Sequence, residues 1–219
     1  MTTTDDNQDT GAVSGLLTGV IFVGALVGAI KMANSRIPRP GSPAEAVREY
    51  WGGSAKAARF SATGQLISTA MLARFTQSVM RLAKRSQSRA LEATALAGGG
   101  LAVVSLTNAA VTHARLTGKS KEDDEKAVKM ANRVFVSGGP IHGIGFGALM
   151  AALALAGDRT GDLPKPVVIA GLVSAGSSIA SPLYFLWEPA GWLIPIGRFG
   201  GYIVSGIAGV KLALSKKKR

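Results

Sequence analysis

The feature of this sequence that most constrains its fold is a set of long apolar runs with almost no charged residues. A transmembrane helix needs about 20 mostly apolar residues, and five segments approach or exceed that length. They cover residues 12–30, 93–112, 134–157, 166–187 and 192–214, and only the last contains Lys or Arg, at Arg198 and Lys211. Five such runs in 219 residues predict an all-α polytopic membrane helix bundle.

Charge and composition narrow the class further. Charged residues make up 17% of the chain, below the level of about a quarter that is typical of soluble domains. The net charge of +12 would favour nucleic-acid binding in a soluble protein, but in a membrane protein it is typical of basic loops beside anionic lipid. We therefore expect the lipid bilayer as a partner and no nucleic acid. The sequence has no cysteine, which excludes disulfides and thiolate chemistry.

A sixth segment, residues 57–82, is ambiguous because it is apolar on one face and basic on another. This pattern is typical of an amphipathic helix at the membrane surface, or of a span with one polar face turned into the bundle. With five spans, the basic residues between 31 and 90 share one side of the membrane, as the positive-inside rule favours. With six spans, basic loops fall on both sides.

Two short motifs bear on this choice. Residues 131–143 read ANRVFVSGGPIHG and residues 192–199 read WLIPIGRF. They resemble the fourth helix and the start of the last helix in a group of small, uncharacterised actinobacterial integral membrane proteins. The resemblance implies six spans, with 57–82 as the second, and supplies no activity or functional residue. We therefore expect a polar tail at 1–11, a six-span bundle at 12–214 and a basic tail at 215–219, with both termini cytoplasmic in the cell membrane.

Two connecting segments carry signals for the start of a helix. Residues 42–45, Ser-Pro-Ala-Glu, form a capping box with proline at the first helical position, which predicts a short helix to about Trp51. Residues 120–123, Ser-Lys-Glu-Asp, predict a second loop helix with its acidic residues in the first turn. We interpret both helices as solvated connectors.

Polar residues inside the spans form the candidate intramembrane site, because such residues are costly in lipid and are often functional. They are Arg74, Asn108, His142 and Arg198. His142 is either a functional titratable group or a neutral histidine bonded to a neighbouring helix, and the second interpretation is favoured. Arg198 is expected at the interface if its helix begins at Gly197; if the helix begins at Trp192, it lies inside the bundle and needs a carboxylate such as Glu188.

Glycines spaced four residues apart let helix backbones approach closely in lipid. We expect such helix packing at Gly15, Gly19, Gly24, Gly28, Gly139, Gly143, Gly147, Gly197 and Gly201. Residues 143–148 also match a dinucleotide fingerprint, and 118–120 match the end of a phosphate-binding loop. Both motifs need a preceding strand, which these apolar runs do not supply, so no cofactor is expected.

The sequence contains no complete catalytic or metal-binding constellation, and its two histidines have no metal-ligand spacing. The leading expectation is a non-enzymatic accessory or scaffold subunit that contacts a membrane-protein partner or a second copy of itself. One alternative is a small transporter or channel-like protein for a small molecule, ion or lipid, whose polar span residues would converge on one cavity. Another is a membrane-embedded lipid-modifying enzyme with His142 as the base.

Overall fold

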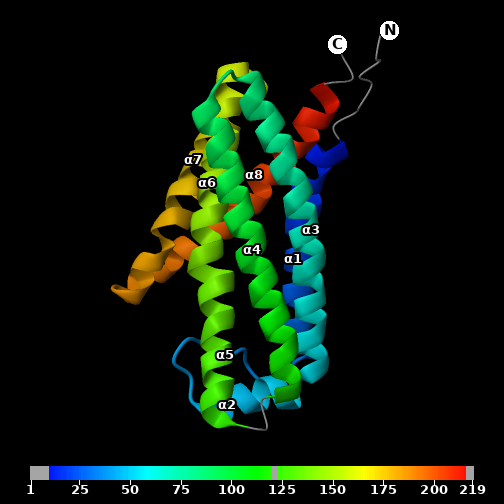
Figure 1. Cartoon of the computed structure of the whole chain (residues 1–219), viewed down its shortest axis with the longest axis vertical. Coiled ribbons are helices and arrows are strands. Elements are labelled where there is room, and N and C mark those ends of the chain that lie inside the picture. Colours follow the sequence, from blue (N-terminus) through cyan, green and yellow to red (C-terminus); the bar gives the residue numbers. More distant parts are fainter. Residues whose placement is uncertain (1–9, 120–122, 216–219) are drawn as a thin grey trace.

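The computed structural model describes residues 10–119 and 123–215, and this part of the chain folds into an all-α helix bundle (Figure 1). The long helices are α1 (Thr10–Met32), α3 (Ala55–Arg85), α4 (Arg89–Lys119), α5 (Asp124–Val136), α6 (His142–Thr160), α7 (Lys165–Ala180) and α8 (Leu193–Ser215). Shorter turns connect them: α2 (Ala44–Arg48), η1 (Glu49–Gly53), η2 (Ser137–Ile141), η3 (Ser181–Phe185) and η4 (Glu188–Trp192). The predicted fold class is confirmed. Most of the two predicted tails, at 1–9 and 216–219, lies outside the described residues.

Five helical segments are long and apolar enough to cross a membrane. They are Gly11–Met32, Arg89–Thr117, Asp124–Thr160, Lys165–Phe185 and Glu188–Leu214, and they coincide with the five apolar runs. The third joins α5, η2 and α6 into one continuous segment of 37 residues. Pro140 lies in its π-helical turn η2, as is common where a proline interrupts the regular hydrogen-bond ladder.

Helix α3 is a long helix in addition to these five segments, and it packs between α1 and α4 along the bundle (Figure 1). It has 31 residues, which corresponds to about 46 Å at 1.5 Å per residue. It runs antiparallel to α1: Gly28 contacts Phe60 near one end, and Gly15 contacts Phe75 towards the other. α1 begins and α8 ends at the same end of the bundle, called the upper end here and drawn at the top of Figure 1.

Small residues hold the helices close together. A methyl group added to a packed glycine would lie 3.0 Å or less from a neighbouring helix, and this holds at Gly15, Gly19, Gly28, Gly143, Gly147, Gly197 and Gly201. The packing prediction is confirmed at these positions. Serine hydroxyls donate across the same interfaces: Ser68 to the carbonyl of Thr18 at 2.9 Å, and Ser205 to that of Gly15 at 3.1 Å.

The packing prediction is wrong for Gly24 and Gly139. In the part of the chain that the structure describes, nothing lies within 4 Å of a methyl group placed at either residue. Gly24 is on an exposed face of α1, because the four-residue spacing does not specify which face of a helix meets a neighbour. Other close approaches were missed. A methyl group added at Gly64 would lie 2.1 Å from the Ala25 Cβ atom, and one added at Gly209 would lie 2.1 Å from the Ala12 carbonyl oxygen.

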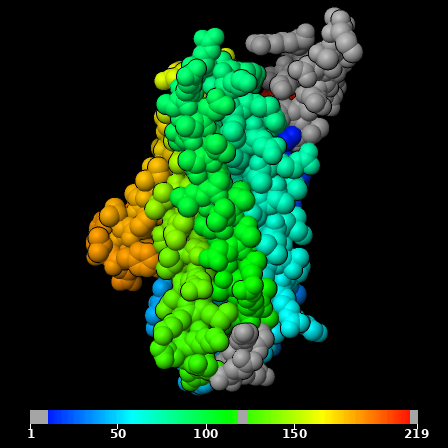
Figure 2. Space-filling view, viewed as in Figure 1, coloured from blue at the N-terminus to red at the C-terminus, as the bar shows by residue number. Residues whose placement is uncertain are grey.

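Helices α7 and α8 are joined by an elbow, residues 181–192, that projects sideways from the bundle (Figures 1 and 2). Trp187 and Trp192 on this elbow are 65% and 75% exposed. Below the elbow, α1, α3, α4 and α5 continue to the lower end without α7 and α8 (Figure 1). The lower part of the bundle therefore has fewer helices around its axis than the upper part.

The segment between α1 and α3 folds back under the lower end of the bundle. Val47, Tyr50 and Trp51 are buried there in a second hydrophobic cluster with residues of α4 and α5, so this segment is more than the solvated connector expected. The predicted capping box is also wrong, because Pro43 takes the N-cap position and makes no side-chain cap. In the other loop, Asp123 caps α5 by accepting from the backbone of Lys126 at 3.1 Å; Ser120 to Glu122 lie outside the described residues.

Candidate functional site

The four candidate polar residues do not converge on one cavity. Arg74 lies on an exposed face of α3, beside the start of α1 at Gly11. Asn108 is exposed on α4 and donates to the Ser137 hydroxyl at 2.7 Å. Only His142 and Arg198 come together, on either side of a small void inside the bundle.

Arg198 lies in the second turn of α8, inside the bundle, as expected for a helix that begins near Trp192 rather than at Gly197. The helix begins at Leu193, and the guanidinium extends towards η2, where its Nη2 atom donates to the carbonyls of Gly138 and Gly139. Its guanidinium carbon lies 5.5 Å from the centre of the Phe22 ring, a distance typical of a cation–π interaction. Phe22 stands near the middle of α1 (Thr10–Met32).

The charge of Arg198 has no acidic partner among the residues that the structure describes, and the suggested pair with Glu188 is not formed. Its two contacts to glycine carbonyls are dipolar and leave the net charge uncompensated. Arginine offers five N–H donors, and within the described part of the chain only those of Nη2 form hydrogen bonds.

His142 is enclosed in the core. Its Nδ1 atom lies 3.1 Å from the carbonyl oxygen of Ala102, and its ring stacks on Phe146 with a centroid distance of 5.6 Å. Since a carbonyl only accepts, Nδ1 carries the proton and donates. The void that His142 shares with Arg198 has a volume of about 10 Å³, which leaves no room for a substrate. The favoured interpretation, a histidine bonded to a neighbouring helix, is confirmed.

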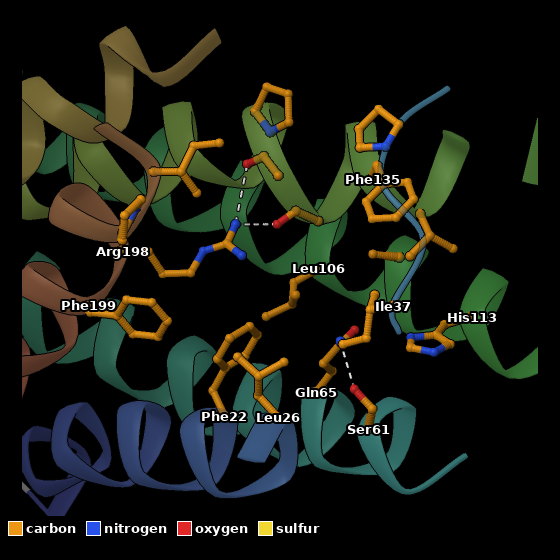
Figure 3. Close-up of a pocket in the computed structure, with 18 of the residues that line it drawn as sticks. Phe22, Leu26, Ile37, Ser61, Gln65, Leu106, His113, Phe135, Arg198 and Phe199 are labelled. Atoms are coloured by element: carbon orange, nitrogen blue, oxygen red, sulfur yellow. Dashed lines mark hydrogen bonds between the residues drawn. The ribbon is translucent and has the colours of Figure 1, made fainter. Parts of the chain in front are cut away.

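A cavity with a volume of about 390 Å³ lies in the lower half of the bundle, in the space that α7 and α8 leave open (Figure 3). Its walls are mostly apolar, and among the described residues that line it only Arg198 carries a permanent charge. In Figure 3 the Arg198 guanidinium stands at one side of this space and His113 at the other. The lining residues are Phe22, Leu26, Ile37, Pro40, Tyr50, Trp51, Ser61, Gln65, Leu106, Ala109, His113, Val134, Phe135, Gly138, Gly139, Pro140, Tyr184, Ile194, Pro195, Arg198 and Phe199.

The lower wall of the cavity contains an aromatic cluster of Tyr50, Trp51 and His113. Trp51 meets Tyr50 edge-on at a centroid distance of 4.9 Å and His113 at 5.5 Å. The three residues are 1%, 1% and 6% exposed. Within residues 10–119 and 123–215, neither ring nitrogen of His113, the Trp51 Nε1 nor the Tyr50 hydroxyl has a hydrogen-bond partner, and the same holds for the Oε1 atom of Gln65 nearby.

Burial of the Tyr50 side chain raises its pKa above the usual value of 10 by desolvation, since the phenolate is poorly solvated away from water. The Tyr50 hydroxyl is therefore an uncharged polar group at neutral pH, without a hydrogen-bond partner in the described part of the chain. An unsatisfied buried polar group costs about 1 to 3 kcal/mol, so any molecule or water that bonds this hydroxyl stabilises the cavity.

Sequence reasoning missed the aromatic cluster and Gln65. His113 directly follows the apolar run 93–112, and Tyr50 and Trp51 belong to a segment that was expected to be a solvated connector. The available signal was the pair of large aromatic residues in a segment that was expected to be solvated. Among the described residues, no group of three or more His, Cys, Asp or Glu side chains is close enough to hold a metal ion.

Comparison with known proteins gives no match: no family model, no curated protein and no solved structure is similar to this chain. The description of the site therefore depends on its geometry alone.

Proposed function

We propose that this protein is a non-enzymatic integral membrane protein that binds a lipid-like small molecule in the cavity between α1, α4 and α5. The observation that carries the proposal is the combination of size and lining. A volume of about 390 Å³ lies in the range of ligand pockets, roughly 300–1,000 Å³, which are typically apolar with a few placed polar groups. The proposal shares its ligand class, a small molecule or lipid, with the transporter or channel-like alternative from the sequence, but it does not include transport.

The two ends of the cavity support an amphipathic ligand. Arg198 supplies unused donors and a charge at one end, and the buried aromatic cluster of Tyr50, Trp51 and His113 forms the other end. Apolar side chains such as Leu26 and Leu106 lie between them (Figure 3). A molecule with an apolar body and a polar group is complementary to this arrangement.

We further propose six spans in the cell membrane, with both termini in the cytoplasm. The position of α3 between α1 and α4 supports its role as the second span, and an even number of crossings places the two chain ends on one side. The exposed Trp187 and Trp192 of the elbow are typical of a membrane interface. The orientation rests on the basic C-terminal tail, residues 215–219.

Native mass spectrometry of the full chain, gently extracted from its membrane, tests the function. We expect about one small molecule per chain, released on activation. Leu26→Trp places a large side chain in the cavity and is expected to abolish the occupancy. Val27→Trp is the matched control, because Val27 is the next residue on α1 and is 45% exposed on the outer face. A wild-type chain that carries nothing, or a Leu26→Trp variant as fully occupied as wild type, contradicts the proposal.

An accessory role in a membrane complex is the second candidate, favoured by a groove on the outer face of the bundle between α1 and α8. Gly19 and Gly206 lie in this groove with Val20, Ile203 and Ile207, and small residues admit a neighbouring helix. The same mass measurement separates the candidates. A stoichiometric second protein chain, or a second copy, that is lost in Gly206→Leu would support the accessory role; a single chain with bound lipid supports the cavity.

A further inference from the structure

We propose that Arg198 is the specificity determinant of the cavity and selects an amphiphile with an anionic head, a carboxylate or a phosphate, over a neutral one. The inference rests on the proposed function and adds to it the chemical class of the ligand. The inference concerns the polar head of the ligand, which binds beside η2, and not the length of the ligand's apolar chain.

The positive charge of Arg198 is not balanced by a nearby negative charge in the part of the chain that the structure describes. Among residues 10–119 and 123–215, no carboxylate forms an ion pair with Arg198. Its Nη2 atom donates only to the carbonyls of Gly138 and Gly139. Arginine within a membrane-spanning segment is costly unless it meets a counter-charge or water, so an anion at this point would lower the free energy of the folded protein.

The N–H donors of the Arg198 guanidinium are only partly used. The hydrogen bonds from Nη2 hold one edge of the guanidinium. The Phe22 ring, whose centre lies 5.5 Å from the guanidinium carbon, covers one face. No hydrogen bond from Nη1 or Nε occurs in the described part of the chain. The N–H groups of Nη1 and Nε remain to donate to a carboxylate or phosphate oxygen, in charge-assisted hydrogen bonds. A neutral hydroxyl would leave the charge uncompensated.

A bare inorganic anion does not fit as the main occupant of the cavity. The guanidinium opens into a space lined by Leu26, Leu106 and Phe199 rather than by further donors (Figure 3). A small anion alone would leave this apolar volume unfilled, whereas an acyl chain fills it and buries apolar surface. The anionic head and the chain are therefore required together.

Competitive photo-labelling of the full chain in phosphatidylcholine nanodiscs at pH 8 tests the inference. A diazirine-bearing fatty alcohol is the probe, and dodecanoic acid, 1-dodecanol and dodecyl phosphate are the competitors. We expect the acid or the phosphate to displace the probe from wild type at a concentration at least ten times lower than the alcohol. Arg198→Gln is expected to remove this preference while the alcohol still competes, and Arg198→Lys is expected to retain part of it. Arg115→Gln, at an exposed arginine outside the cavity, is expected to behave as wild type.

Each outcome has a defined meaning. A lower concentration for the acid than for the phosphate identifies a free carboxylic acid, and the reverse identifies a phosphate-bearing lipid. Equal competition by acid and alcohol in wild type overturns the inference but leaves the proposed function intact, provided that Leu26→Trp blocks the labelling. An undiminished preference in Arg198→Gln also overturns it. A wild-type cavity that no probe labels overturns both proposals.

Discussion

The contact between α1 and α3 gives the sharpest test of the fold, because it involves the one helix whose place in the membrane the sequence left open. A methyl group added at Gly64 would lie 2.1 Å from the Ala25 Cβ atom. Ordinary contacts between such atoms begin near 3.4 Å, so the two helices must separate by more than an ångström in Gly64→Ala. Overpacking of a tight interface costs about 1 to 3 kcal/mol, and we expect this loss in the free energy of unfolding.

Gly24→Ala is the matched control on the partner helix. Nothing in the described structure lies within 4 Å of the added methyl group, and alanine is a better helix former than glycine by about 1 kcal/mol. We expect this variant to be as stable as wild type or slightly more stable. Equilibrium unfolding of the full chain in mixed micelles, followed by circular dichroism, measures both changes.

The double variant Ala25→Gly/Gly64→Ala tests whether the contact itself is responsible. With the Ala25 methyl group removed, the nearest atoms to the new one are the Ala25 Cα at 3.5 Å and the Ile21 carbonyl oxygen at 3.8 Å. We therefore expect the second substitution to recover most of the loss, a coupling of the kind that neighbouring residues show. If Gly64→Ala is as stable as Gly24→Ala, residues 57–82 do not pack on α1, and the surface-helix alternative stands.

Two further predictions concern topology and pH. The chain has no cysteine, so single cysteines introduced at Arg39 and Lys84 can be labelled by a membrane-impermeant maleimide; six spans place them on opposite sides, and labelling from the same side refutes α3 as a span. The raised pKa of Tyr50 means that the folded chain binds this proton more tightly than the unfolded chain, so wild type should lose stability relative to Tyr50→Phe as the pH rises above 10. Below about pH 9 the difference between them should be constant, and a difference that never changes with pH contradicts the burial of this hydroxyl.

The five apolar spans could be predicted from the sequence because their signal is local. Length and lack of charge define a span without knowledge of its neighbours. Each of the five apolar runs overlaps one helical segment, although the segment Asp124–Thr160 begins ten residues before its run at 134–157. Helix α3 has a different signal. Arg59 and Arg74 lie on its exposed face, while Leu72, Phe75 and Val79 are buried against the bundle, so its average hydropathy conceals an apolar face.

The candidate site could be predicted only in part, because it depends on how helices end and meet. His142 was recognised, and its bond to a neighbouring helix was anticipated, since a buried histidine needs a partner. The place of Arg198 depended on the first residue of α8, which proline and glycine in 195–197 left open. The burial of Tyr50 and Trp51 depends on the chain folding back under α4, and no local pattern in the sequence encodes that return.

The elbow between α7 and α8 determines both the open space of the cavity and the position of Arg198 beside it. Because both helices stop at the elbow, the lower half of the bundle lacks two of its walls, and the space between α1 and α5 remains open. The same interruption fixes Arg198. A side chain at Gly197 would clash with Ser178, whose Oγ atom lies 2.4 Å from the position of an added methyl group, so the first turn of α8 lies directly against α7. That contact turns the next residue towards the carbonyls of η2. The elbow thus opens the apolar cavity and also places the Arg198 guanidinium at the edge of that cavity. This shared origin is the physical basis for regarding the cavity and Arg198 as one site.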